Sequence, residues 1–184
     1  VLKNKSLTLI DGPSVKILEK KISRLFGKKY GLMVNSGSSA NLLGLASFDL
    51  KKGSEVITPT LTFSTTLAPI YQLGLIPHFI DVDENTFTAK ISQIKKAINK
   101  KTKAIIIPNL LGNVPDWKEI YKIAKHYKLK IIEDSADTIG YTINKNHYGK
   151  YSDITTNSMY ASHIITGAGF GGMVCFNDKK LYDK

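Results

Sequence analysis

Three segments of this 184-residue chain carry side chains that could bind an anion, hold a cation and move a proton. The first segment, residues 35–41, reads Asn-Ser-Gly-Ser-Ser-Ala-Asn and is followed by an apolar helix pattern. A hydroxyl-rich turn that opens a helix presents free backbone N–H groups and the positive end of the helix dipole, and both suit a phosphate. Taken alone, the segment is better explained as an ordinary N-cap, because serine is a preferred capping residue. No Gly-Lys-Ser/Thr follows the turn, which excludes a P-loop.

The second segment is Glu133-Asp134-Ser135-Ala136-Asp137, which follows a short apolar run. A carboxylate at the end of a buried strand is costly unless it is paired. A cationic ring nitrogen and a metal ion are both suitable partners. A helix N-cap or a structural salt bridge explains the same residues equally well, so these positions alone leave the alternatives open.

The third segment runs from Ser158 to His163 and continues into a glycine-rich stretch, residues 164–172. Histidine titrates near neutrality, as a general acid or base must. A single histidine is more often structural than catalytic, and the glycines could simply shape a turn. The position of His163 near the end of a predicted strand favours the catalytic interpretation.

The elements that must position these segments alternate between strand and helix. Short apolar runs predict strands at 55–58, 76–80, 104–107, 130–133, 154–159 and 173–176, and helical spacing predicts helices at 15–26, 38–49, 65–73, 91–99 and 116–127. This alternation predicts an α/β fold, a three-layer, mainly parallel (mixed) sheet with helices on both faces. Such sheets bind ligands beyond the carboxyl ends of their strands, where all three segments fall.

A net charge of +11 raises the hypothesis of a nucleic-acid binder. However, Arg24 is the only arginine, so 25 of the 26 basic residues are lysines. Direct base readout and bidentate phosphate recognition favour arginine. The lysines are therefore interpreted as solvent-exposed surface residues, and no nucleic-acid partner is predicted.

The sequence lacks the features typical of membrane proteins, of secreted proteins and of proteins with disulfides or thiolate metal sites. No apolar run approaches the roughly 20 residues that cross a bilayer, and the N-terminal residues lack the apolar stretch of a secretory signal. The sequence thus predicts a cytoplasmic protein without a membrane partner. Cys175 is the only cysteine, which excludes an internal disulfide and any metal or iron–sulfur site built on several thiolates within this chain. No metal site is assigned.

Seven motifs together resemble the DegT/StrS-type sugar aminotransferases and dehydrases, vitamin B6 enzymes of the aspartate-aminotransferase fold. The motifs lie in family order and near family spacing, at residues 35–41, 55–63, 81–83, 101–104, 111–113, 133–134 and 169–172. Family chains are about twice this length and end in a smaller C-terminal domain. The resemblance therefore implies that residues 1–184 are the cofactor-binding large domain of the PLP-dependent transferase (fold type I) architecture, truncated before the second domain.

The resemblance also implies roles for single residues. Phe63 would lie against one face of the pyridine ring of the cofactor, and Asp134 would pair with the protonated ring nitrogen. Asp137 stands where many family aminotransferases have Gln or His near the ring hydroxyl. Three serines would hold the cofactor phosphate: Ser38, Ser39 and Ser158.

His163 occupies the position at which family aminotransferases carry the lysine that binds the cofactor covalently. No lysine lies between Lys150 and Lys179, so the cofactor, pyridoxamine or pyridoxal phosphate, would be held non-covalently. The dehydrase branch of the family has this same change. By resemblance, the chain would catalyse the 3-dehydration of a nucleotide-linked 4-keto-6-deoxyhexose in deoxysugar and surface lipopolysaccharide synthesis. The histidine would remove a proton from the cofactor methylene, and the C3 hydroxyl would leave as water.

The implied partners are a nucleotide-sugar substrate, an amino-acid amine donor such as glutamate, and a second copy in a homodimer. Cluster-bearing relatives have cysteine just after the aspartate, where this chain has Ser135-Ala136, so no iron–sulfur cluster is expected in this chain. Two alternatives stay open besides the nucleic-acid binder. One is a nucleotide-sugar aminotransferase whose lysine is supplied unconventionally, and the other is a non-catalytic subunit that keeps the fold.

Overall fold

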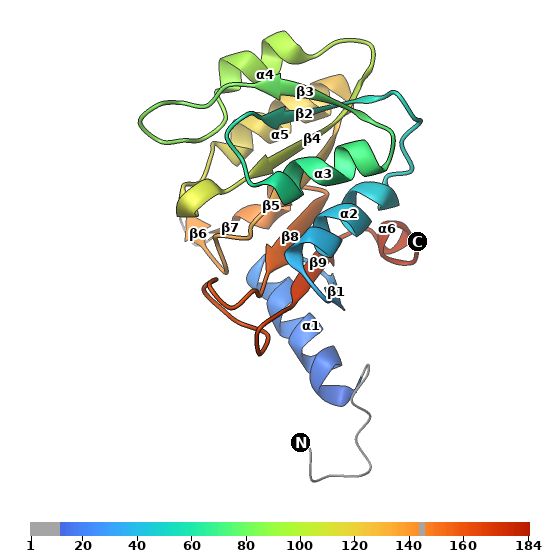
Figure 1. Ribbon diagram of the computed structural model, residues 1–184, viewed down its shortest axis with the longest axis vertical. Coiled ribbons are helices and arrows are strands. Elements are labelled where there is room, and N and C mark those ends of the chain that lie inside the picture. The colour runs from blue at the N-terminus through green and yellow to red at the C-terminus, as the bar shows by residue number, and fades with distance from the viewer. Residues whose placement is uncertain (1–11, 144–145) are drawn as a thin grey trace.

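The structure, a computed structural model, describes residues 12–143 and 146–184. Its strands in the main sheet are β1 (Tyr30–Val34), β2 (Glu55–Pro59), β3 (Ile76–Ile80), β4 (Thr102–Pro108), β5 (Lys130–Asp134), β8 (Ile154–Ser158) and β9 (Gly172–Phe176). They form one mixed sheet in the order β1-β9-β8-β5-β4-β2-β3 (Figure 1). β9 is antiparallel to both of its neighbours, and the other pairs are parallel. The short strands β6 (Thr142–Ile143) and β7 (Asn146–His147) pair separately.

Helices cover both faces of the sheet, as Figure 1 shows. One face packs against α2 (Gly37–Ser47) and α3 (Ser64–Gln72), with α6 (Lys179–Tyr182) at its edge. The other face packs against α1 (Pro13–Leu25), α4 (Ile91–Ala97) and α5 (Trp117–Tyr127). The predicted fold class, a mainly parallel mixed sheet with helices on both faces, is confirmed.

Strand β4 shows why the central strands read as continuous apolar runs. Ile105 and Ile107 point into the core beneath α4 and α5, whereas Ala104 and Ile106 point into the core beneath α2 and α3. All four side chains are completely buried. A strand that is buried on both faces needs apolar residues at every position rather than at alternate ones.

The sequence pattern does not predict β1, which follows the lysines at 28 and 29 and contains a glycine. Gly31 is required there by close packing, because a Cβ at this position would lie 2.7 Å from the backbone oxygen of Glu19 in α1. β1 pairs with β9, residue for residue from Tyr30 opposite Phe176 to Val34 opposite Gly172. The pairing places the turn at 35–36 at the same edge of the sheet as the ends of β5 and β8.

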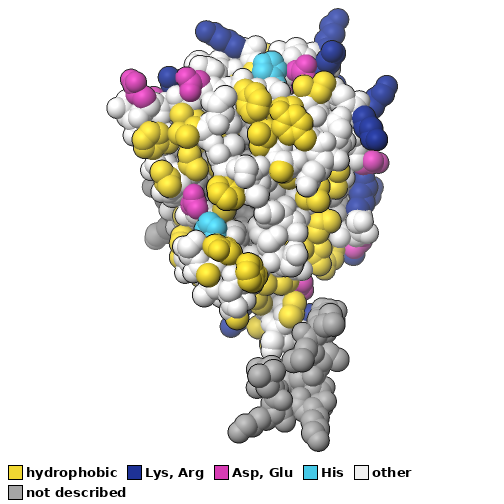
Figure 2. Space-filling model, viewed as in Figure 1, with side chains coloured by type: hydrophobic (Ala, Val, Ile, Leu, Met, Phe, Trp, Pro, Cys, Tyr) yellow, Lys and Arg dark blue, Asp and Glu magenta, His cyan; other side chains and the backbone are white. Residues whose placement is uncertain are grey.

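Charged and apolar side chains are unevenly distributed over the surface. On the face shown in Figure 2, Lys and Arg side chains stand mainly along the margins, and hydrophobic side chains are spread across the middle. None of the helices within the described residues combines the length and the apolar character that crossing a bilayer requires.

A buried lysine, Lys28, lies near Glu133, the first residue of the second segment with candidate chemistry. Nζ of Lys28 donates hydrogen bonds to the backbone oxygen and to Oγ of Ser152. Burial lowers the pKa of Lys28 to about 8, although the nearby charge of Glu133 opposes this. Burial also raises the pKa of the neighbouring Cys175 thiol to about 12. Each of these two groups binds a different number of protons in the folded chain than in the unfolded chain at alkaline pH. The free energy of unfolding must therefore change with pH in that range.

We expect Lys28 by itself to raise the free energy of unfolding by roughly 1 kcal/mol between pH 8 and pH 9, and the native protein to show about half of this rise. In this window Lys28 has lost its proton in the folded chain but retains it in the unfolded chain, so a higher pH favours folding. From about pH 8 the unfolded chain begins to lose the Cys175 proton that the folded chain retains; this offsets part of the gain up to pH 9 and cancels it at higher pH. Urea unfolding of the Lys28→Met and Cys175→Ala variants separates the two contributions. Lys28→Met should show no rise, and Cys175→Ala should continue to gain stability up to about pH 10.5. A rise that persists in Lys28→Met would contradict the assignment.

Candidate active site

A pocket of about 860 Å³ opens where the carboxyl ends of the parallel strands meet. Six segments contribute to its wall: residues 36–41, 61–66, 108–111, 134–137 and 158–163, and Phe87. They follow β1, β2, β4, β5, β8 and, in the case of Phe87, β3, and these strands all end at this edge of the sheet. The volume and the position are both typical of small-molecule sites in α/β proteins.

The structure brings six of the seven predicted site residues to this pocket: Ser38, Phe63, Asp134, Asp137, Ser158 and His163. Ser39 is not among the lining residues. Its backbone N–H donates a hydrogen bond of 3.1 Å to Oγ of Ser36, and its own Oγ accepts one of 3.1 Å from the same hydroxyl. Ser36 thus caps α2, and this cap holds Ser39 on the first helical turn behind the pocket wall.

The N-terminus of α2 and the end of β8 form the part of the pocket best suited to an anion. The first N–H groups of a helix have no partner within the helix, and here they open beside the hydroxyls of Ser38 and Ser158. Gly37 permits the close approach of the two elements, because a Cβ on it would lie 2.7 Å from Cβ of Ser158. This corner combines hydroxyl donors, free backbone N–H groups and a positive helix end.

Asp134 is a buried acid held by neutral donors. Its Oδ2 accepts hydrogen bonds of 2.8 Å from Nδ2 of Asn41 and of 2.8 Å from Oγ1 of Thr66, and its Oδ1 accepts one of 3.1 Å from the N–H of Ala136. Burial raises the pKa of the Asp134 carboxyl, and these hydrogen bonds only partly oppose the effect. A cation in the pocket would favour the ionised form of this side chain.

A metal ion would need several ligands near Asp134. Within residues 12–143 and 146–184, no three His, Cys, Asp or Glu side chains lie close enough together to hold one. Asp137 is an acidic neighbour of Asp134, and its charge adds to the effect of burial in raising the pKa of the Asp134 carboxyl. In the described part of the chain, the partners of Asp134 are the neutral donors of Asn41, Thr66 and Ala136.

His163 lies across the pocket in a turn that follows β8. Its backbone N–H donates to the backbone oxygen of Tyr160 at 3.0 Å, and its ring stands roughly perpendicular to that of Tyr160, with centroids 6.4 Å apart. Nδ1 of His163 lies 3.5 Å from Oδ1 of Asp137. The imidazole is thus partly buried in the wall that also contains Asp134 and Ser158, where a bound molecule would be within its reach.

The rim of the pocket is strongly apolar. Phe63, at the start of α3, is 69% exposed although it lines the pocket, so one face of its ring is available to a planar ligand. Other large hydrophobic side chains at the pocket or in the adjoining loop are also exposed: Leu61, Phe87, Leu111, Tyr160, Ile164 and Phe170.

Residue patterns alone did not identify the groups that hold the predicted acids. Asn41 belongs to the hydroxyl-rich turn, but only the fold shows that its amide reaches Asp134 while its Oδ1 accepts from Thr156. Thr66 lies inside a predicted helix and has no local signal of a site role. The N–H of Leu111, which donates to Oδ2 of Asp137 at 2.8 Å, is a backbone group that no side-chain pattern can reveal.

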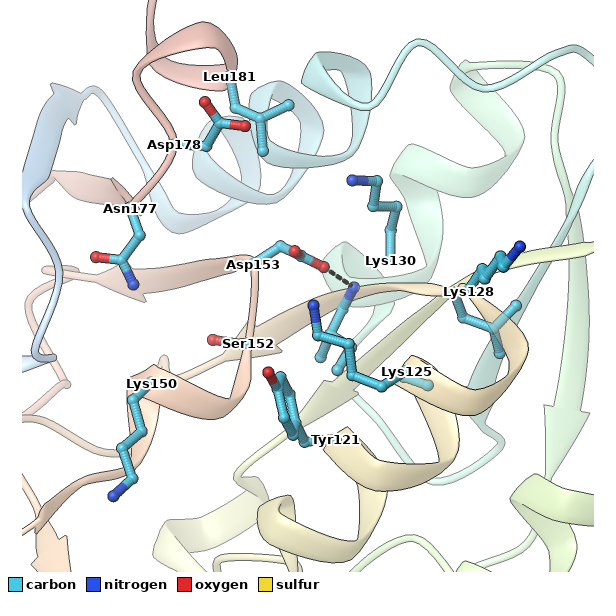
Figure 3. A pocket seen from close by; sticks show the side chains of 13 residues that line it. Tyr121, Lys125, Lys128, Lys130, Lys150, Ser152, Asp153, Asn177, Asp178 and Leu181 are labelled. Carbon is cyan, nitrogen blue, oxygen red and sulfur yellow. Dashed lines mark hydrogen bonds between the residues drawn. The ribbon is translucent and has the colours of Figure 1, made fainter.

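A second pocket, of about 400 Å³, lies at the opposite edge, where β5 and β8 begin (Figure 3). Four lysines surround it together with Asp153 and Asp178: Lys125, Lys128, Lys130 and Lys150. The carboxylate of Asp153 binds the backbone, since its Oδ2 accepts a hydrogen bond of 2.8 Å from the N–H of Ile131. None of the predicted site residues lines this pocket, so the chemistry is concentrated at the carboxyl edge.

Comparisons with known proteins agree with this geometry. Residues 1–184 match the DegT/DnrJ/EryC1/StrS aminotransferase family. The chain is 41% identical over 177 residues to a GDP-4-keto-6-deoxy-D-mannose 3-dehydratase of Yersinia pseudotuberculosis, covering 93% of this chain and 45% of the relative. It is 43% identical over 164 residues to the lipopolysaccharide biosynthesis protein RfbH of Salmonella typhimurium, covering 85% and 37%.

A solved structure gives the same result at the level of the fold. It is a GDP-4-keto-6-deoxymannose-3-dehydratase with a trapped PLP-glutamate geminal diamine, and it superimposes with a TM-score of 0.87 at 38% identity over 93% of this chain. That match covers 46% of the solved chain. The chain therefore spans less than half the length of these relatives.

Proposed function

The chain belongs to the DegT/DnrJ/EryC1/StrS aminotransferase family, and from this premise we propose that it serves a PLP/PMP-dependent sugar dehydratase. The reaction would be the 3-dehydration of a nucleotide-linked 4-keto-6-deoxyhexose, on a route to surface lipopolysaccharide. One observation carries the proposal. His163 lines the same pocket as Asp134 and Ser158, and none of the described residues lining that pocket is a lysine.

The residues of the pocket fit pyridoxamine or pyridoxal phosphate. Asp134 is a buried acid whose pKa is raised by burial, and a protonated pyridine nitrogen would favour its ionised form. The hydroxyls of Ser38 and Ser158 lie with the N-terminus of α2, where a phosphate is favoured. The exposed ring of Phe63 offers a face for the pyridine. Cation site, anion site and aromatic surface thus occur in one pocket.

In the proposed reaction, the residues of this chain bind, orient and move protons. When bound, the cofactor withdraws electrons from the sugar through its charged ring, which eases loss of a proton and of the neighbouring hydroxyl. Asp134 keeps the ring nitrogen protonated, and Ser38 and Ser158 fix the phosphate. His163 accepts the proton on an imidazole nitrogen and can return it to the departing oxygen. An imidazole cannot replace the amine of the cofactor, so it does not divert the reaction towards amine transfer.

Glutamate is the proposed amine donor, because a solved relative was trapped with a PLP-glutamate adduct.

We also propose a homodimer. The exposed side chains of the apolar rim include Phe63, Leu111 and Phe170. Together they make a larger exposed apolar area than isolated surface hydrophobic residues do, and such areas mark protein interfaces. Sedimentation velocity of the protein at the full length that its gene encodes measures this directly.

Mass spectrometry tests the proposed reaction. The protein, at the full length that its gene encodes, is incubated with pyridoxamine phosphate, glutamate and a panel of 4-keto-6-deoxy sugar nucleotides. We expect a 3-deoxy sugar nucleotide with one oxygen atom fewer than the substrate, because the C3 hydroxyl leaves as water and the cofactor amine, restored by glutamate, supplies the two electrons. A product that carries an amine at C4 and retains its C3 oxygen would instead support a nucleotide-sugar aminotransferase. Binding of neither cofactor nor sugar would support a non-catalytic subunit.

A further prediction concerns the phosphate end of the pocket. Gly37→Ala is expected to weaken pyridoxamine phosphate binding about tenfold or more, because the added Cβ would push the start of α2 away from Ser158. Gly44→Ala, in the same helix, is the matched control, since its Cβ would meet side-chain methyl groups, of which the nearest is the Cγ2 of Ile154, at 3.3 Å. Titration calorimetry compares the two variants. Equal affinity for the cofactor in both would show that this corner does not hold the phosphate.

A further inference from the structure

The carboxylate of Asp137 is fixed from one side by the backbone. Its Oδ2 accepts a hydrogen bond of 2.8 Å from the N–H of Leu111. Leu111 has a φ of 56° and the following Gly112 a φ of 82°. A left-handed conformation is unfavourable for leucine, and strained residues of this kind gather at functional sites. The turn after β4 therefore adopts a costly conformation that points its N–H at Asp137.

The other oxygen of Asp137 faces His163. Oδ1 lies 3.5 Å from Nδ1 of the imidazole, and both side chains are partly buried, with 33% and 24% exposed. Among the described residues that line the pocket, the groups able to carry a charge are these two, Asp134 and Tyr160. Asp134 is bound to three donors of its own. Asp137 is thus the carboxylate placed to act on His163.

We infer that Asp137 is a positioning residue for His163, an assignment that rests on the proposed function for its catalytic consequence. A neutral imidazole carries its proton on one nitrogen only. A fixed carboxylate beside Nδ1 holds the proton there, which leaves the lone pair of Nε2 free to take the proton of the substrate adduct. The electron pair of the broken C–H bond stays on the adduct, and the carboxylate stabilises the imidazolium that results.

This role differs from the one implied by resemblance, in which Asp137 contacts the ring hydroxyl of the cofactor. Both oxygens of Asp137 are already directed at protein groups, Oδ2 at the N–H of Leu111 and Oδ1 at His163. The two roles predict different losses. A cofactor ligand would change the affinity for pyridoxamine phosphate, whereas a positioning residue changes the tautomer of His163 even when no cofactor is bound.

Asp137→Asn is a sharp test, because the geometry dictates how asparagine must sit. The N–H of Leu111 requires an acceptor, so the amide oxygen takes the place of Oδ2 and the NH₂ group faces His163. A donor facing Nδ1 moves the imidazole proton to Nε2, the nitrogen that should accept it. The fold and the turn are retained, and the base is in the wrong tautomer.

Two measurements follow. Long-range proton–nitrogen NMR spectra of the cofactor-free protein should show Nδ1–H on neutral His163 in the native protein and Nε2–H in Asp137→Asn. The variant should lower kcat for sugar dehydration about 100-fold or more, with KM and cofactor affinity changed by less than about threefold. Asp116→Asn is the matched control, since Asp116 also accepts from a backbone N–H, that of Glu119, but is the N-cap residue of α5 and lies outside the pocket lining. It should leave both readouts unchanged, and Asp137→Glu should restore the native tautomer.

The outcomes separate this inference from the proposed function. An unchanged tautomer in Asp137→Asn overturns the inference, whatever the activity. A loss of cofactor affinity that matches the loss of kcat also overturns it and assigns Asp137 to the cofactor. If the tautomer inverts but the native protein dehydrates no sugar, the pairing of Asp137 with His163 stands and the proposed function fails.

Discussion

His163→Asn is expected to lower the turnover of a 4-keto-6-deoxy sugar nucleotide about 1,000-fold, the loss typical of removing a general acid–base group. Asparagine has a similar size and can keep a polar contact with Asp137, but it cannot take up a proton. Because His163 lines the pocket without contributing to the buried core, cofactor affinity and melting temperature should change little. Steady-state kinetics and cofactor titration on the same preparation measure the separation.

His126→Asn is the matched control, because His126 is exposed on α5 and lies away from the pocket. It should retain full turnover. His163→Lys extends the test by replacing the base with an amine. It should lose dehydration and let borohydride fix the cofactor to the protein, which intact-protein mass spectrometry detects. Equal dehydration by the native protein and either His163 variant would refute the role of this residue as the base.

The fold was largely predictable from the sequence because the physics of its sheet is local. β4 is buried on both faces, so its centre reads as an uninterrupted apolar run in the printed sequence, and β5 has the apolar pair Ile131 and Ile132 at its centre. Their ends were less predictable: β4 was expected at 104–107 and is Thr102–Pro108. Strand ends depend on which neighbouring backbone groups are available to pair. β1 escaped prediction for the same reason, since its partner β9 lies about 140 residues away in the chain.

The types of the site residues were predictable, and the groups that control them were not. Parallel strands end at one edge, so a serine turn, an acidic pair and a histidine at strand ends could be expected to meet. The hydrogen bond from Asn41 to Asp134 joins residues 93 positions apart, and that from Leu111 to Asp137 uses a backbone N–H. Such contacts arise only when the loops are assembled. Ser39 illustrates the reverse case, because its place in the motif suggested a ligand and the structure uses it in the N-cap.

Asp134 links the stability of the cofactor-free protein to its proposed activity. Burial raises the pKa of this carboxyl above that of an unfolded chain. Asp134 therefore ionises at a lower pH in the unfolded chain than in the folded chain. Its own contribution lowers the free energy of unfolding as the pH rises from about 4 towards the pKa of Asp134 in the folded chain. Other carboxyls, such as Glu55, have lowered pKa values and act in the opposite direction. The contribution of Asp134 is thus seen only as a difference between the native protein and a variant.

Asp134→Asn is expected to remove that contribution and to lower dehydration at least about 100-fold, because an uncharged amide cannot keep the cofactor nitrogen protonated. In cofactor-free protein, the difference in unfolding free energy between native protein and variant should change with pH in the acid range, in favour of the variant as the pH rises. Urea unfolding at pH 4 to 7 gives this difference, and cofactor titration at neutral pH should show weaker binding by the variant.

Asp153→Asn is the matched control for Asp134→Asn. Asp153 lies at the opposite edge of the same sheet, where β5 and β8 begin, and it accepts a hydrogen bond from the N–H of Ile131. It removes a carboxylate without touching the proposed cofactor pocket, so dehydration and cofactor affinity should stay at the native level. Full activity in Asp134→Asn would mean that the buried acid is only a structural partner of Asn41 and Thr66. The cationic partner of the pocket would then have to be sought elsewhere, and the fit of a protonated pyridine to this site would no longer hold.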